Sequence, residues 1–245
     1  MEALVIGASR GIGLAFIRQY LGMIHCQRVY GTYRHLSAEL KLLQAEYPER
    51  LVLLPVDVTQ EDQIIQAIAT LKGQAQRLDE VIYCVGLLHQ QTLQPEKSLR
   101  HIHPENLLTY FQINAIGAVL WAKHLAPLLR HGDRAVFAAI SAKVGSIEDN
   151  RLGGWYGYRA SKAALNMFLK NIAIEWKRTM SQAIVVALHP GTTDTELSQP
   201  FQKNVPPEKL FTPERTANQL RLVLDRLTDQ DSGQFLSWDG TPLPW

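Results

Sequence analysis

The feature that most constrains the fold of this 245-residue chain is a regular alternation of short apolar runs with longer stretches of helical periodicity. The apolar runs, rich in β-branched residues, occupy residues 3–6, 29–33, 51–56, 80–85, 135–140, 184–188 and 233–238. Helical periodicity fills most of the intervals, at 12–21, 38–46, 61–71, 107–129, 159–177 and 213–227. This order predicts βαβ units, because parallel strands need a long crossover that is usually a helix.

The strand runs are almost continuously apolar, which indicates a sheet that is buried on both faces. We therefore expect an α/β fold of the doubly wound Rossmann type, with a mostly parallel seven-stranded sheet and helices on both faces. Pro55 cannot donate to a strand ladder, so the third strand is expected at a sheet edge. Residues 1–245 are expected to form one domain, in which the Pro-rich stretch 195–212 is either a substrate lid or an ordered surface loop.

Composition excludes several classes of protein. A hydrophobic content of 46% and a formal charge of +2 argue against disorder, and the scattered basic residues predict neither a nucleic-acid nor a membrane-surface partner. Polar residues interrupt 107–129, which argues against a membrane span, and the chain opens directly on a strand run rather than a secretion signal. Cys26 and Cys84 suit neither a disulfide framework nor a zinc site. A soluble, cytoplasmic protein without a metal is expected.

The first strand run leads directly into a glycine-rich turn that opens the first helical stretch. Glycines allow a tight turn and let the backbone approach a pyrophosphate at the positive end of a helix. The spacing Gly-x-x-x-Gly-x-Gly differs from the Gly-x-Gly-x-x-Gly of other dinucleotide folds, and a purely structural turn is the alternative. The sequence therefore predicts a dinucleotide site that includes Gly7, Ser9, Arg10, Gly11, Ile12 and Gly13.

The residues after the second and third strands bear on the choice of cofactor. An acidic residue after the second strand would bind the adenosine ribose of NAD, whereas basic residues match the 2′-phosphate of NADP. Arg34 follows this strand without a neighbouring carboxylate, and Arg10 lies in the glycine turn, so NADP(H) is the expected cofactor. Either arginine alone could be a solvated surface charge. Asp57 and Val58 fall where the adenine is expected, and Asp57 is also a candidate helix N-cap.

A tyrosine and a lysine four residues apart begin a long helical stretch. Tyr158 and Lys162 would share one helix face and address the same bound molecule. A cation about 4 Å from a phenolate is worth about 4 kcal/mol at an effective dielectric of about 20, which lowers the pKa of a phenol from about 10 toward the range of acid-base catalysis. Tyr156 lacks such a partner and is the weaker candidate. Tyr-x-x-x-Lys pairs are also common on helix surfaces, which is the alternative explanation.

Taken together, these motifs resemble the short-chain dehydrogenase/reductase family over essentially the whole chain. The glycine turn, Asp57, Asn114, the serine strand near Ser141, the Tyr158 and Lys162 pair, and Pro190-Gly191 occur in the order of that family. The segments 145–147, 149–151, 153–166 and 239–245 are similar to the C-factor and sniffer-type carbonyl reductase branch.

The resemblance implies a reaction and a set of roles. Hydride would pass between the nicotinamide and a small carbonyl or alcohol substrate, while Tyr158 gives or takes the proton on oxygen. Lys162 would hold the nicotinamide ribose and depress the pKa of the tyrosine, and Asn114 would orient a water behind Lys162. The resemblance also assigns cofactor contacts to Gly86, Pro190, Gly191, Thr193 and Thr195, although turn chemistry alone would explain Pro190-Gly191.

The serine that polarises the carbonyl is the position where the chain fits the family least well. Relatives carry it three residues before a glycine, and the residue at that distance from Gly145 is Ala142. Ser141 is the favoured candidate, but a shift of one residue along a strand turns a side chain to the other face. Ser146, no serine at all, or a purely structural role for Ser141 are the alternatives.

Two further departures keep other functions open. Ile6 stands where the family has Thr, and Tyr83-Cys84-Val85-Gly86 replaces Asn-Asn-Ala-Gly. The alternatives to a reductase are a cofactor-binding regulatory or signalling protein with vestigial activity, and a scaffold. The stretches 107–129 and 159–177 are apolar on more than one face, and the resemblance implies that they pair in a homo-oligomer, either a dimer or a tetramer. Burial beneath loops of the same chain is the alternative.

Overall fold

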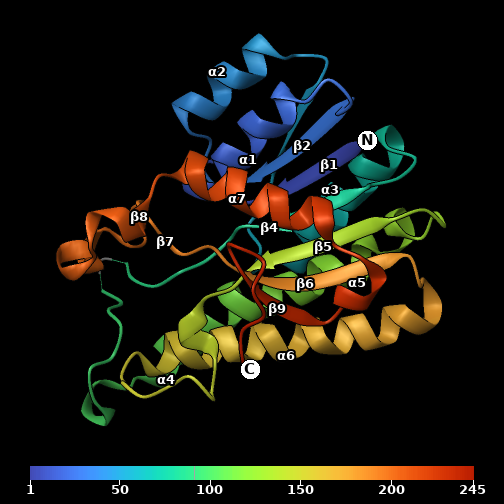
Figure 1. The fold of residues 1–245 in the computed structure, drawn as a ribbon. Helices are drawn as coiled ribbons and strands as arrows, with labels where there is room; N and C mark the ends of the chain where they lie inside the picture. Colours follow the sequence, from blue (N-terminus) through green and yellow to red (C-terminus); the bar gives the residue numbers. More distant parts are fainter. Residues whose placement is uncertain (91) are drawn as a thin grey trace.

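A computed structural model describes residues 1–90 and 92–245 of the chain. Its centre is a parallel seven-stranded sheet in the order β3-β2-β1-β4-β5-β6-β9 (Figure 1). The strands are β1 (Glu2–Ile6), β2 (Arg28–Tyr33), β3 (Leu51–Pro55), β4 (Glu80–Tyr83), β5 (Ala135–Ile140), β6 (Ala183–His189) and β9 (Gln234–Ser237). The expected fold class is confirmed, and so is the edge position of the third strand, where Pro55 leaves no ladder bond unmade.

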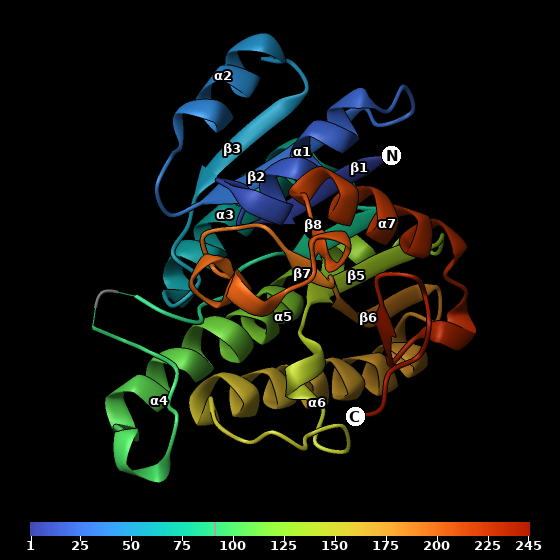
Figure 2. The same ribbon diagram turned by 60° about the vertical axis from the view of Figure 1, so that its left-hand side comes forward.

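Helices cover both faces of the sheet. One face packs against α1 (Gly11–Gly22), α2 (Ala38–Glu46) and α7 (Pro213–Arg226). The other packs against α3 (Glu61–Gln74), α5 (Gly117–Leu129) and α6 (Tyr156–Thr179). Figure 1 shows α6 and α7 on opposite sides of the sheet, and Figure 2 shows α4 (Pro104–Phe111) outside these layers, beside the start of α6. The apolar runs are buried on both sides because every strand lies between two helical layers.

The predicted helix over 107–129 is wrong in one respect, because it is not continuous. It divides into α4, a π-helical turn (Gln112–Ile116) and α5. A π-turn inserts one residue into the helical ladder and re-aims the side chains around it, and such turns gather at functional sites. Periodicity could not show the break, because apolar residues continue across it.

The stretch 195–212 contains more structure than the sequence indicated. It holds two 3₁₀ turns, Gln199–Asn204 and Pro207–Lys209. Strand β7 (Thr192–Thr193) pairs in parallel with β8 (Leu210–Phe211), so both ends of the stretch are fixed together. No helix among the described residues is long and apolar enough to cross a membrane.

A buried ionic cluster joins the sheet to α7. Glu80 at the start of β4 is 2% exposed and accepts from Arg221 Nη2 at 2.7 Å and from the Tyr20 hydroxyl at 2.8 Å. Arg221 also pairs with Asp225, one turn further along α7. Glu80 on the sheet and Arg221 on α7 are therefore both buried where the two elements meet, and each neutralises the charge of the other.

Candidate active site

The glycine turn lies between β1 and α1, at the carboxyl end of the sheet. Gly7 and Gly11 adopt positive φ angles of 89° and 54°. A Cβ at position 13 would overlap the carbonyl oxygen of Gly7, and a Cβ at position 7 would lie 2.7 Å from the side chain of Val85. The turn therefore depends on glycine for its own shape, whatever ligand it binds.

The N-terminus of α1 has no side-chain cap among the described residues. Arg10 is the N-cap residue in an extended conformation, and no described side chain accepts a hydrogen bond as its cap, nor does an acidic residue occupy the first turn. Ser9 instead donates to the carbonyl of His35 at 2.8 Å, and Ile12 packs partly into the core. The amide groups of this helix end and its dipole favour an anion at this position.

Thr32 on β2 takes part in the turn, and the sequence analysis did not assign it. The amide of Gly7 donates to Thr32 Oγ1 at 3.1 Å. Ile6, which stands where the family has Thr, is fully buried. The chain thus supplies a hydroxyl tether to the glycine turn from the neighbouring strand, and the only signal was a polar side chain within an apolar run.

The two arginines expected to select the cofactor follow neighbouring strands of the sheet. Arg10 and Arg34 are both exposed and follow the carboxyl ends of β1 and β2, which are neighbours in the sheet. Arg10 forms an exposed ion pair with Glu196, from the segment after β7. Arg34 follows β2 directly, with His35 and Leu36 beside it.

Asp57 and Val58 follow β3 but make local contacts. Asp57 Oδ1 accepts from the amide and the hydroxyl of Thr59 at 2.9 and 2.8 Å. The N-cap position of α3 is Gln60, so the alternative role of Asp57 as the cap of that helix is wrong. The side chain of Val58 is buried, and a Cβ at position 117 would lie 3.1 Å from it.

Tyr158 and Lys162 are both buried in the first two turns of α6. Lys162 Nζ lies 5.9 Å from the centre of the Tyr158 ring and donates to the carbonyl of Ile140 at 2.9 Å. Burial lowers the pKa of Lys162 to about 8. Burial also raises the pKa of Tyr158 above its usual value, which is opposite to the direction expected from the neighbouring lysine. The cause is the removal of the Tyr158 hydroxyl from water, which disfavours its charged form.

Asn114 lies in the π-turn and is fully buried. Its amide group donates to Leu87 O and to Ser161 Oγ, both at 2.9 Å, and its Oδ1 accepts from Leu87 N at 2.7 Å. A Cβ at position 86 would lie 3.6 Å from Lys162 Nζ and 3.8 Å from Asn114 Oδ1. The structure therefore brings Gly86, Asn114 and Lys162 together. The predicted role of Asn114 in orienting a water stays a prediction.

The serines occupy different surroundings from Tyr158. Ser141 is 2% exposed and donates to Asn166 Oδ1 on α6 at 2.6 Å. Ser146 donates to the carbonyl of Trp245 at 3.1 Å. Ala142 packs against the apolar cluster that contains Tyr158. The structure thus gives both candidate hydroxyls other partners, and a substrate would have to replace Asn166 to use Ser141.

The segment after β6 lies beside the glycine turn. Gly191 has a φ of 73°, and a Cβ there would lie 2.6 Å from the ring of Phe211. Pro190 and Thr193 are buried, and the hydroxyl of Thr193 lies 2.8 Å from that of Thr216. The methyl group of Thr195 would lie 3.1 Å from a Cβ at Gly11, so this segment meets the glycine turn directly.

Aromatic side chains that the sequence analysis did not assign surround Tyr158. The ring of Trp155 lies 6.1 Å from that of Tyr158 and 4.8 Å from that of Phe201, and His89 lies 5.8 Å from Phe201. Leu197 belongs to the same apolar cluster. These residues come from three separate loops, and the Gly153-Gly154-Trp155 run before the helix was the available signal.

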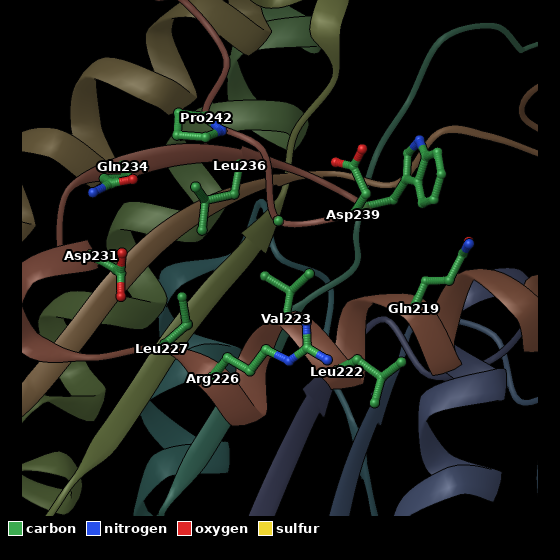
Figure 3. A pocket seen from close by; sticks show the side chains of 12 residues that line it. Gln219, Leu222, Val223, Arg226, Leu227, Asp231, Gln234, Leu236, Asp239 and Pro242 are labelled. Carbon is green, nitrogen blue, oxygen red and sulfur yellow. The ribbon is translucent and has the colours of Figure 1, made fainter.

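The hollow in Figure 3 lies elsewhere, between α7 and the C-terminal segment. It has a volume of about 420 Å³. Val223, Leu227, Leu236, Arg226 and Asp231 are among the residues that line it. None of the predicted catalytic or cofactor residues lines it.

Comparison with known proteins assigns the chain to a family. The family model described as short chain dehydrogenase matches residues 2–206. The chain belongs to the short-chain dehydrogenase family. One relative is the C-signal protein of Myxococcus xanthus, which is 34% identical over 135 residues, covering 55% of this chain and 76% of that protein.

Two solved structures share the fold over the full length of this chain. The carbonyl reductase Sniffer of D. melanogaster is 25% identical, with a TM-score of 0.88 and coverage of 100% of this chain and 99% of that one. The NADPH-bound carbonyl reductase from chicken fatty liver is 27% identical, with a TM-score of 0.87 and coverage of 100% and 94%. The resemblance to the C-factor and sniffer branch is confirmed.

Proposed function

We propose that this short-chain dehydrogenase is an NADP(H)-dependent carbonyl reductase that transfers hydride between the nicotinamide and a small carbonyl or alcohol substrate. The observation that carries the proposal is the convergence of Gly86, Lys162 and Asn114 beside the glycine turn, with Tyr158 one helical turn before the lysine. This arrangement joins a nucleotide cradle to a proton donor. The carbonyl reductase neighbours support the same activity.

The residues present fit a dinucleotide. The uncapped start of α1 supplies amide donors for a pyrophosphate, and glycines at positions 7, 11 and 13 allow the tight turn that brings the chain to this helix end. Gly86 leaves space beside Lys162 Nζ, which suits a ribose hydroxyl. Arg10 and Arg34 would hold the 2′-phosphate. When bound, the cofactor supplies the hydride.

The protein residues manage the proton and the polarity of the site. Tyr158 donates its proton to the substrate oxygen during reduction, and the elevated pKa of its buried hydroxyl keeps this proton in place until the oxygen becomes negative. Lys162 orients the ribose and stabilises the phenolate that remains. Asn114 fixes the backbone of Leu87 against Ser161, and so holds the loop after β4 against the catalytic helix.

The surroundings of Tyr158 indicate the character of the substrate. Trp155, Phe201, Leu197 and Ala142 form an apolar enclosure around the proton donor. Such an enclosure favours a carbonyl whose substituents are apolar or aromatic, because charged substituents would lose water without gaining a partner.

The direct test is NADPH oxidation by the purified protein over a panel of aldehydes, ketones and quinones. Turnover with apolar carbonyls supports the proposal. NADPH binding without turnover on the panel would favour the alternative, a cofactor-binding regulatory or signalling protein. The similarity to C-signal and the altered motifs at Ile6 and at residues 83–86 prompt this alternative.

Cofactor preference gives a separate prediction. NADPH is expected to bind more tightly than NADH, and Arg34→Ala is expected to weaken NADPH binding by the value of one charge-assisted contact. One charge-assisted contact is worth about 1.5 to 3 kcal/mol, or roughly 10- to 150-fold in Kd. Both dissociation constants are measured at one salt concentration. Arg18→Ala is the matched control, since Arg18 is an exposed residue of α1 that pairs with Glu39. Equal wild-type affinities for NADPH and NADH contradict the assignment.

The role of Ser141 is tested by Ser141→Ala with Ser146→Ala beside it. A hydroxyl that donates to the developing oxyanion is worth about 2.7 to 4 kcal/mol of barrier, or roughly a hundred- to thousandfold in kcat. A loss of that size in the Ser141 variant alone identifies the donor. Near-normal rates in both variants would leave Tyr158 as the only hydroxyl that acts on the substrate.

We also propose that the chain forms a homo-oligomer through α5 and α6. Ile116, the last residue of the π-turn before α5, and Met167 and Ile174, on α6, are 40%, 60% and 46% exposed. Large apolar side chains so exposed along α6 and immediately before α5 are typical of a contact with another copy.

A further inference from the structure

The catalytic helix α6 begins at an unusual backbone geometry. Gly153, Gly154 and Trp155 all have positive φ angles, and Trp155 is the only non-glycine residue with one in the described part of the chain. A non-glycine residue with a positive φ has a strained backbone, and this conformation persists only where the surrounding contacts stabilise it. Tyr158 lies just three residues further on, so whatever holds Trp155 also holds the proton donor.

Glu96, from the loop between β4 and α4, supplies that hold. The amide of Trp155 donates to the Glu96 carbonyl at 2.5 Å, and the amide of Gly157 donates to Glu96 Oε2 at 3.0 Å. Glu96 is 1% exposed. Trp155, the N-cap residue, makes no side-chain cap bond, and the first turn of α6 contains no acidic residue. Glu96, 61 positions before Gly157, therefore caps the N-terminus of α6. Its carboxylate lies at the positive end of the helix dipole.

The fit around this carboxylate is close. A Cβ at position 157 would overlap the ring of Tyr110 and lie 3.0 Å from Glu96 Oε1, so only glycine lets the carboxylate reach the helix. The ring of Tyr110 lies 6.4 Å from that of Tyr158. Burial, and next the charge of Glu96, raise the pKa of Tyr110 above its usual value. Oε1 of Glu96 has no hydrogen-bond partner among the described residues.

We infer that Glu96 is a positioning residue, which fixes the first turn of α6 and thereby sets the place of the Tyr158 hydroxyl and of the Trp155 ring over the substrate. The inference rests on the proposed reductase function for its kinetic consequences. Glu96 acts through hydrogen bonds to the backbone of Trp155 and Gly157, without contact between its own side chain and the substrate. Asn114 holds the loop after β4 through its hydrogen bonds to Leu87. Glu96 connects the same loop to the catalytic helix at a second point.

The kinetic test compares Glu96→Ala and Glu96→Gln in the full-length protein. Glu96→Ala is expected to lower kcat at least tenfold, while the Kd of NADPH stays within twofold of the wild type. It is also expected to increase the primary isotope effect with deuterated NADPH, because a misplaced proton donor slows the chemical step. Glu96→Gln is expected to retain at least a third of kcat, because a glutamine oxygen still accepts from Gly157 and the free Oε1 has no bond to lose. Glu105→Ala, in the exposed first turn of α4, is the matched control with wild-type kinetics.

Amide hydrogen exchange tests the same inference without any turnover. The amides of residues 155–160 are expected to exchange at least tenfold faster in Glu96→Ala than in the wild type, Glu96→Gln or Glu105→Ala. If the wild type proves inactive on every carbonyl while this exchange difference appears, the proposed function fails and the positioning role stands. Wild-type exchange and kcat in Glu96→Ala would overturn the inference, as would a Glu96→Gln variant that loses as much of both as Glu96→Ala.

Discussion

Tyr158→Phe is expected to lower kcat about a thousandfold or more while the NADPH Kd stays within about threefold of the wild type. The hydroxyl acts on the substrate oxygen only as charge develops there, and a positioned acid contributes about 10²- to 10⁴-fold. The phenyl ring keeps the packing against Trp155 and Tyr110. Steady-state NADPH oxidation with a substrate from the carbonyl panel measures kcat, and fluorescence titration measures the Kd of NADPH.

Tyr156→Phe is the matched control for this experiment. Tyr156 lies two residues earlier, is 37% exposed, and has Ala160 rather than a lysine one turn later. Its variant is expected to keep wild-type kcat. Retention of wild-type turnover by Tyr158→Phe would show that another group delivers the proton.

Glu80→Ala is expected to lower the free energy of unfolding by about 3 to 5 kcal/mol, because it leaves the buried guanidinium of Arg221 with only the half-exposed Asp225 as a carboxylate partner. Arg221 is 7% exposed and Tyr20 is fully buried, so water cannot replace the lost partner at little cost. Natural domains are stable by only about 5 to 15 kcal/mol, so the variant should unfold at a much lower urea concentration. Urea unfolding followed by circular dichroism gives the value.

Two further variants place this result in context. Glu39→Ala removes an exposed partner of Arg18 and is expected to change stability by less than about 1 kcal/mol. Glu80→Gln keeps an acceptor for Tyr20 and Arg221 and is expected to lose less than Glu80→Ala, which keeps the comparison measurable if the alanine variant does not fold. A loss below about 1 kcal/mol in Glu80→Ala would mean that the buried pair contributes no net stability.

The sequence determined the architecture and the place of the site. Apolar runs separated by helical periods record which residues each strand and helix buries, and a parallel sheet with two helical layers is the arrangement that buries them all. Pro55 correctly marked an edge strand, because a missing donor is a local property of the residue. The glycines at 7, 11 and 13 likewise mark a turn that needs glycine locally, because residues 7 and 11 have positive φ angles and a Cβ at position 13 would overlap the carbonyl oxygen of Gly7.

Only the tertiary structure decided the finer arrangement around Tyr158. Three hydrogen bonds around the site join residues that lie 25 to 61 positions apart. They connect Gly7 to Thr32, Leu87 to Asn114, and Gly157 to Glu96. Local periodicity does not record such partners, because it reports which face is buried and not which group lies opposite. The raised pKa of Tyr158 has the same origin, since desolvation depends on everything packed around the ring. The sequence therefore specified the chemical groups at this site, and packing decided their partners and their proton affinity.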